Sequence, residues 1–309
     1  MNTDYHIPVM LKECIDGLDI NPRGTYVDVT FGGGGHSSEI VKVLEGGKLY
    51  AFDQDPDAKK NAEKLPADKF QLIQANFSHI KKFLKLYGVK QIDGLIADLG
   101  ISSHQIDEFS RGFSFRENAD LDMRMSQTGE LTAAKVLNTY SEGELHKIFG
   151  IYGEVKNAKT LAKEVLRARA GSDIKEVDHL LGVLAELAPR HRENRYYAQV
   201  FQALRIEVNQ ELWALEQLIQ QCTELLKPKG RLVVMSYHSL EDRLVKNYIA
   251  KGVFNGQGEK DFYGKLLKPL DAITRKPVVA TPEESAVNNR ARSAKLRVAV
   301  RNEESWPIK

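Results

Sequence analysis

A run of four glycines directly after a short apolar segment constrains this chain more than any other feature. The segment from Thr25 to His36 reads TYVDVTFGGGGH, and two further apolar segments end in Asp53 and Asp98. Glycine lacks a Cβ, so a turn built from glycines lets the backbone approach a ligand closely. Strands that each end in such residues predict a parallel sheet whose ligand lies across the carboxyl ends of the strands.

Two kinds of nucleotide cofactor fit this turn, and the residues alone leave both open. The dinucleotide fingerprint G-x-G-x-x-G, started at Gly32, places Ser37 where a third glycine belongs, so the match is imperfect. The pattern acidic-x-x-x-Gly-x-Gly, typical of S-adenosylmethionine methyltransferases, is matched by Asp28, Gly32 and Gly34. Asp53 stands 21 residues after Gly32, where an acidic side chain can accept hydrogen bonds from ribose hydroxyls. A glycine turn without a ligand is the third alternative.

The order of the expected elements predicts an α/β fold with an insertion. Strands are expected at 26–30, 49–52, 70–74 and 92–97, with helices at 37–44, 56–65 and 78–87. Apolar residues at helical spacing dominate 107–209, and strands return at 231–235, 272–279 and 295–300. We therefore expect residues 1–106 and 210–309 to form one Rossmann-like sheet domain. Residues 107–209 are expected to form an inserted, mostly helical domain, placed at a strand end where it can recognise a substrate.

The composition is typical of a soluble protein with unevenly spread charge. The 309 residues are 42% hydrophobic, their formal net charge is +2, and no run of about 18 apolar residues or signal peptide is present. Cys14 and Cys222 lack metal-ligand spacing, which fits a cytoplasmic protein. Residues 210–309 hold 17 Lys and Arg against 12 Asp and Glu. That excess could face phosphates, and a solvated charged surface without a partner is the alternative.

Asp98 is the strongest candidate for a reacting group, because its carboxylate is expected at the reactive end of a cofactor. It could accept a hydrogen bond from a substrate amine such as cytosine N4, a poor nucleophile whose lone pair is delocalised into the ring. A turn or helix-capping role is the alternative. His238 follows an expected strand and suits a site or a structural role, while Ser239 and Asp242 have the spacing of a capping box. His36 has no partner four residues on, so no metal site is expected.

A basic cluster lies near the C-terminus, at Arg290, Arg292, Lys295 and Arg297. Alternation with a period of two places Lys295 and Arg297 on one face of a strand, where charge protects an exposed sheet edge. Arg290 and Arg292 precede that strand in an expected loop. They are candidates for contacts with phosphates.

Taken together, these segments closely resemble the ribosomal RNA small-subunit methyltransferase H family over nearly the whole chain. The motifs that carry the resemblance are HIPVML (6–11), DVTFGGGGHS (28–37), FDQDP (52–56), DLGISS (98–103), RGFSF (111–115), LDMRM (121–125), FQALRI (201–206), SYHSLEDR (236–243) and NRARS (289–293). So many separate motifs in the family's order are far more specific than any one of them.

The resemblance implies an enzyme that methylates N4 of a cytidine in the decoding centre of 16S ribosomal RNA. It implies S-adenosylmethionine as cofactor and the small ribosomal subunit as partner, with no membrane, and it leaves the oligomeric state open, a dimer included. It also implies a set of residues that contact the cofactor, namely Gly34, Gly35, His36, Asp53, Phe77, Asp98 and Gln105. Asp98 would in addition carry the catalytic role.

One departure from a related pattern affects base recognition. Amino-methyltransferases that act on DNA carry Pro-Pro-aromatic after the acidic residue, whereas Leu99, Gly100 and Ile101 follow Asp98 here. The aromatic ring that stacks on a flipped base is therefore expected elsewhere, with Phe113 or Phe115 as candidates. Methylation of another amine in DNA or protein, and a nucleotide-binding module without turnover, are the alternative functions.

Overall fold

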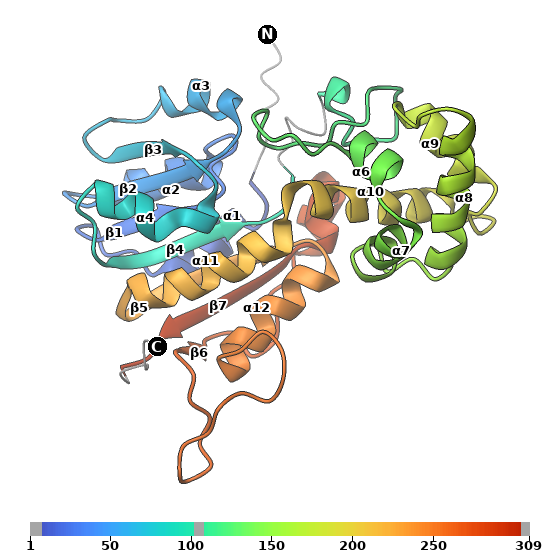
Figure 1. Ribbon diagram of the computed structural model, residues 1–309. Coiled ribbons are helices and arrows are strands. Elements are labelled where there is room, and N and C mark those ends of the chain that lie inside the picture. The colour runs from blue at the N-terminus through green and yellow to red at the C-terminus, as the bar shows by residue number, and fades with distance from the viewer. Residues whose placement is uncertain (1–7, 102–107, 304–309) are drawn as a thin grey trace. The chain divides into compact units, whose positions relative to one another are not determined.

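Two compact units make up the chain in the computed structural model, which describes residues 8–101 and 108–303 (Figure 1). One unit combines residues 1–100 with 212–309, and the other is the continuous segment 101–211. These bounds lie a few residues from those expected from the sequence. None of the helices in the described part of the chain is long and apolar enough to cross a membrane.

The first unit is built on a seven-stranded sheet with the order β3-β2-β1-β4-β5-β7-β6. The strands are β1 (Thr25–Asp28), β2 (Lys48–Asp53), β3 (Phe70–Gln74), β4 (Ile92–Asp98), β5 (Leu226–Ser236), β6 (Leu270–Ala272) and β7 (Lys295–Arg301). The first five run parallel, whereas β7 is antiparallel to both β5 and β6. The expected α/β, Rossmann-like sheet is confirmed.

Strand residues alternate between two hydrophobic cores, because successive side chains of a strand point to opposite faces. Leu95 and Ala97 of β4 enter one core, and Ile96 between them enters the other. The first core also receives residues of α4 (Ile80–Leu86), α11 (Glu211–Leu225) and α12 (Ser239–Lys251). The second receives residues of α1 (Leu11–Leu18) and α2 (Gly35–Val43). Helices therefore cover both faces of the sheet.

The register of the parallel strands gathers polar side chains at one edge of the sheet. Asp28 pairs with Ala51 on one side and with Ile96 on the other, and Asp98 pairs with Met235. The carboxyl ends of β1, β2, β4 and β5 therefore lie together, which is where ligands bind in open α/β sheets.

The second unit is helical, and its core is its own. Its helices are α6 (Ala133–Thr139), α7 (Glu142–Ile151), α8 (Ala158–Gly171), α9 (Val177–Ala185) and α10 (Glu193–Asn209). Ser141 and Glu144 form a capping box that starts α7. Side chains from all of these helices pack into one hydrophobic cluster whose members all lie between residues 101 and 211. A separate core is what a domain needs to fold independently.

Two expected elements were wrong in extent. A strand was expected at 272–279, but β6 ends at Ala272. Beyond it, the N–H of Ile273 donates to Val298 of β7 at 2.9 Å, and Val278 bridges Leu296. Bends at Ile273, Arg275 and Lys276 end the strand before Pro277, which has no N–H to donate to a ladder. The helix expected at 56–65 is a 3-10 turn at Pro56–Ala58 followed by the short α3 (Lys59–Ala62). A further short helix, α13 (Pro282–Val287), and a 3-10 turn (Asn289–Ser293) precede β7.

Candidate functional site

The glycine run forms a tight turn between β1 and α2. Gly32 and Gly34 have φ of 50° and 79°, the left-handed region that favours glycine. A Cβ at Gly34 would lie 3.0 Å from the ring of Phe31, and one at Gly35 would lie 2.1 Å from Cγ of Pro8. At Gly33, in contrast, the position of a Cβ meets no atom within 4 Å. The turn therefore leaves open space beside its backbone, directly before the first N–H groups of α2.

The side chain of Asp28, at the end of β1, stabilises this turn. Its side chain is buried and accepts hydrogen bonds from Oγ of Ser37, at 2.7 Å, and from the backbone N–H of Thr30, at 3.0 Å. Burial raises the pKa of this carboxyl, and the bond from Ser37 opposes that rise. These hydrogen bonds let Asp28 fix the shape of the turn.

Asp53 at the end of β2 connects the turn to the second strand. One carboxylate oxygen accepts the N–H of Gly32 and the other that of Asp55, each at 2.8 Å. Burial raises the pKa of Asp53 to about 6, and these backbone bonds oppose the rise. The half-buried carboxylate oxygens keep further lone pairs for hydroxyl groups.

Phe77 lies beyond the end of β3, at the start of a 3-10 turn (Phe77–His79). Its neighbour Asn76 donates from its side chain to Gln54, at 3.0 Å, and so ties the loop after β3 to the loop that carries Asp53. Phe77 is partly buried against the sheet core. It stands at the same edge of the sheet as Asp53.

Asp98 ends β4 and is held from three sides. Its N–H donates to Oγ1 of Thr30 at 2.7 Å, and the hydroxyl of Tyr237 donates to its Oδ1 at 2.7 Å. Its Oδ2 lies 3.9 Å from Nδ1 of His36, and the side chain remains 24% exposed. Burial raises the pKa of Asp98 to about 6, and His36 and Tyr237 act against that rise. One oxygen is thus fixed by Tyr237, and the other faces the glycine turn.

His36 is the second residue of α2, directly after the glycine turn. Its ring is buried, and its Nε2 lies 3.3 Å from the carbonyl oxygen of Val9. With Nε2 toward the backbone and Nδ1 toward Asp98, the ring bridges the N-terminal segment and the end of β4.

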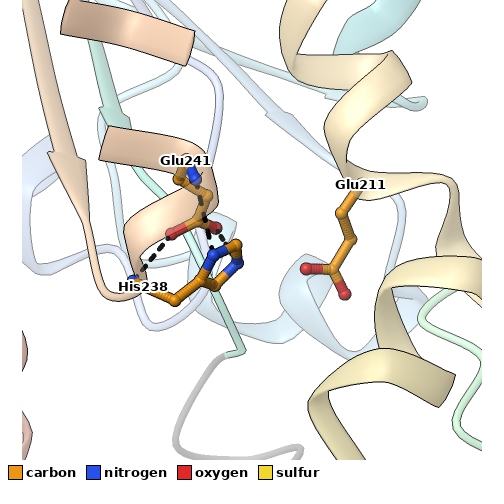
Figure 2. A group of neighbouring side chains, drawn as sticks. All are labelled: Glu211, His238 and Glu241. Carbon is orange, nitrogen blue, oxygen red and sulfur yellow. Dashed lines mark hydrogen bonds and ion pairs between the residues drawn. The ribbon is translucent and has the colours of Figure 1, made fainter. Parts of the chain in front are cut away.

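His238 caps α12, which corrects the expected capping box. Ser239 and Asp242 were expected to form it, but the box consists of His238 and Glu241, one residue earlier, because α12 already begins at Ser239. Figure 2 shows the His238 ring against the Glu241 carboxylate, with Nε2 3.2 Å from Oε1. Glu241 also accepts the N–H of Tyr237, at 2.9 Å. Glu211, drawn in the same figure, belongs to the other unit, where it pairs with Arg205.

The structure places the remaining candidates outside this cluster or in other roles. Phe113 is buried in the core of the helical unit, and Phe115 packs edge-on against Phe201, so Phe113 was a wrong candidate for stacking on a base. Arg290 and Arg292 lie in the 3-10 turn before β7. Lys295 and Arg297 both contact Asp242, at 3.7 and 2.7 Å. The expectation of an exposed sheet edge at this strand was wrong, because β7 lies between β5 and β6 and Arg297 is buried.

Six of the seven expected cofactor residues therefore lie at one edge of the sheet: Gly34, Gly35, His36, Asp53, Phe77 and Asp98. Gln105, the seventh, falls outside the described residues. Sequence reasoning missed Tyr237, although the SYH segment was singled out and His238 was preferred within it. The local sequence carries no signal for this contact, which depends on the pairing of β4 with β5.

This arrangement suits a ligand with several polar groups. The first N–H groups of a helix attract a negatively charged group, the Asp53 carboxylate suits hydroxyls, and the Asp98 carboxylate suits a cation or an amine. Both carboxyl groups have a raised pKa and face the same turn, a combination typical of functional sites.

The family model and the sequence relatives agree on one family. Residues 3–302 match the model of the MraW methylase family. The protein named ribosomal RNA small subunit methyltransferase H from Cytophaga hutchinsonii is 58% identical over 96% of this chain and 99% of its own. The protein of the same name from Flavobacterium johnsoniae is 54% identical over 96% of this chain and 97% of its own. Among solved structures, an rRNA methylase from Streptococcus thermophilus is similar at 12% identity and a TM-score of 0.41, covering 95% of this chain and 94% of its own.

Proposed function

The chain belongs to the MraW methylase family, and on that premise we propose that it methylates N4 of a cytidine in the decoding centre of 16S ribosomal RNA. S-adenosylmethionine supplies the electrophilic methyl group. The observation that carries this proposal is the Asp98 carboxylate, which Tyr237 holds by one oxygen beside the glycine turn. Relatives at 54% and 58% identity that are named as small-subunit rRNA methyltransferases support the substrate.

The residues at the sheet edge fit this cofactor group by group. Its carboxylate suits the first N–H groups of α2, at Gly35 and His36, beside the open space at Gly33. Its ribose hydroxyls suit the half-buried carboxylate of Asp53, and its adenine suits the ring of Phe77 beyond the next strand. Gln105 is assigned to the same ligand from the family resemblance alone.

Asp98 acts on the amine in this proposal. Cytosine N4 is a poor nucleophile because its lone pair is delocalised into the ring. A carboxylate that accepts a hydrogen bond from the amino group favours pyramidal nitrogen, and holding that nitrogen in line with the methyl group converts the reaction into an effectively unimolecular step. Tyr237 fixes the orientation of the carboxylate, so Tyr237 is a positioning residue.

The helical unit, residues 101–211, is assigned to substrate recognition. It interrupts the sheet domain directly after β4, the strand that ends in Asp98. Loops and insertions at the carboxyl ends of parallel strands are the usual place for elements that select a substrate.

Methyl transfer from labelled S-adenosylmethionine tests the proposed function directly. We expect label to enter purified small ribosomal subunits, and nucleoside analysis of the product to find N4-methylcytidine. Free RNA, DNA and bulk protein serve as parallel acceptors. Label that enters DNA or protein in preference to ribosomal RNA would contradict the proposal.

Asp53→Ala is expected to weaken cofactor binding about ten- to a hundredfold, because it removes hydrogen bonds to a charged group worth about 1.5–3 kcal/mol. Calorimetric titration with S-adenosylmethionine measures the effect. Asp68→Ala is the matched control, since Asp68 is an exposed aspartate in the loop before β3. Equal affinity in the two variants would remove Asp53 from the site.

Cofactor affinity is expected to fall as the pH drops through about 6. Asp53 and Asp98 both have a pKa raised to about 6, and protonation removes the charge that the ligand needs. The loss approaches roughly tenfold per pH unit for each group that must ionise. The stability of the protein without cofactor depends on pH in the opposite direction. The folded protein binds these protons more tightly than the unfolded chain, so the free energy of unfolding declines as the pH rises from about 4 to about 6.

Tyr237→Phe separates the contribution of Asp98 to this pH dependence. The hydroxyl of Tyr237 lowers the pKa of Asp98, so its removal should move the acid limb of kcat to higher pH. Tyr248→Phe, which changes another buried tyrosine of the same unit, is the control. Coincident pH profiles for the two variants would leave Tyr237 without a role in positioning Asp98.

A further inference from the structure

Two aromatic side chains stand almost fully in solvent at the tip of a hairpin between α12 and β6. Phe262 is 97% exposed and Tyr263 is 90% exposed, which makes them the most exposed large hydrophobic side chains in the described part of the chain. Their rings meet edge to face, with centroids 5.5 Å apart. In Figure 1 this segment extends away from the sheet next to β6. Nothing in the proposed cofactor site uses these residues.

The hairpin, residues 259–267, has a defined backbone. Lys260 bridges Leu266, the N–H of Asp261 donates to the carbonyl of Lys265 at 2.9 Å, and that of Leu267 donates to Glu259 at 2.9 Å. Phe262 and Tyr263 occupy the two central positions of the turn that closes it. The backbone thus presents both rings before any partner binds, which lowers the entropy cost of binding.

The turn itself explains why the rings point outward. Gly264 donates its N–H to the carbonyl of Asp261 at 3.0 Å and has φ of 83°, as in a hairpin turn followed by a left-handed glycine. The Asp261 carboxylate accepts the N–H groups of Tyr263, at 2.9 Å, and Lys265, at 2.8 Å. The acidic group at the tip is therefore committed to the turn, while the tip shows rings and flanking lysines to solvent.

Charge and ring chemistry together favour one class of partner. The segment 251–268 carries four lysines against two acidic residues, so it has a positive excess. Lys260 and Lys265 are exposed on either side of the ring pair. Aromatic rings flanked by lysines are the combination by which proteins bind single-stranded nucleic acid, with bases stacked on rings and phosphates near cations.

We propose that the 259–267 hairpin binds unpaired bases of the RNA substrate by stacking on Phe262 and Tyr263. The inference rests on the proposed function for the identity of the RNA, and it assigns a second contact with that RNA besides the site at Asp98. The rings supply sequence-tolerant affinity, and Lys260 adds a phosphate contact.

Three variants of the ring pair test stacking against other uses of the hairpin. They are Phe262→Ser with Tyr263→Ser, Phe262→Leu with Tyr263→Leu, and Phe262→Tyr with Tyr263→Phe. The first removes the apolar surface, the second keeps it without a π face, and the third keeps two π faces. Leu86→Ser, which removes an exposed hydrophobic side chain from α4, is the control.

Binding of a labelled single-stranded oligoribonucleotide, followed by fluorescence anisotropy, is the first readout. We expect the Ser and Leu pairs to bind on the order of ten- to a hundredfold more weakly than the parent protein, and the exchanged aromatic pair to retain its affinity. The slope of log affinity against log salt should not change in these variants. It should fall by about 0.7 in Lys260→Ala, because one phosphate contact is lost.

Methylation of small subunits is the second readout, and it separates the inference from the proposed function. In the Ser pair we expect a raised KM for the subunit with kcat unchanged. The inference would be overturned if the Ser pair bound RNA as tightly as the parent protein. It would also be overturned if the Leu pair kept the parental affinity while the Ser pair lost it. The Leu result would identify the tip as an apolar contact for protein or membrane. A parent protein that methylates no ribosomal RNA would instead contradict the proposed function.

Discussion

Asp98→Asn is expected to lower kcat about a hundredfold to a thousandfold at saturating cofactor and saturating RNA. The substitution nearly preserves volume, and the amide oxygen can still accept the hydrogen bond from Tyr237. It removes the negative charge that attracts the amino protons of the target base as the carbon–nitrogen bond forms. Single-turnover methyl transfer, measured with both ligands in excess over their dissociation constants, isolates this step from binding.

The saturating conditions decide between two roles for Asp98. A residue that only holds the cofactor loses affinity when it is changed, and its turnover recovers at high cofactor concentration. Recovery of near-parental kcat in Asp98→Asn would therefore reduce Asp98 to a ligand of the cofactor. Asp53→Ala provides the comparison, because a ribose contact is expected to raise the apparent KM for S-adenosylmethionine with little change of kcat.

Replacing residues 108–209 with a flexible Gly/Ser linker is expected to abolish RNA methylation and to keep cofactor binding within about tenfold of the parent's. The helical unit has its own core, and the sheet unit keeps both of its cores without it. The glycine turn, Asp53 and Asp98 all remain. Calorimetry with S-adenosylmethionine and methyl transfer to small subunits give the two measurements.

The control for this deletion is its own thermal unfolding, which should remain a single cooperative transition if the sheet unit folds alone. A folded deletion variant that methylates ribosomal RNA at the parental rate would refute the assignment of residues 101–211 to substrate recognition. A folded variant that loses cofactor binding as well would show that the removed segment belongs to the cofactor site.

The ends of the strands were predictable because the apolar runs and the residues that end them indicated the same boundaries. β1, β2 and β4 are short apolar runs that each end in Asp, and parallel pairing brings such ends together regardless of the distance along the chain. Asp53 and Asp98 could therefore be placed at one edge from the sequence. The strand expected at 272–279 was wrong because the chain bends from Ile273 on, and Pro277 further along has no N–H for a ladder.

The details of the site depended on contacts that local sequence does not encode. The environment of Asp28 depends on its hydrogen bond with Ser37 of α2. The role of Tyr237 depends on the pairing of β4 with β5, which brings it to Asp98, 139 residues away in the sequence. The capping position of His238 was missed by one residue, because the strand and helix periods overlap at that junction. Phe113 was misplaced since its burial arises within the helical unit.

The position of β7 in the sheet has a consequence for the order in which the protein folds during its synthesis. Lys295–Arg301 pairs with both β5 and β6, and Leu296 and Val298 complete the core that contains residues of the N-terminal helix α1. The continuous segment 101–211 leaves the ribosome about 90 residues before β7 does. Domains fold as units as they emerge. The helical insertion can thus reach its native form while the sheet still waits for its last strand, whose long-range pairing is the kind of contact that forms slowly.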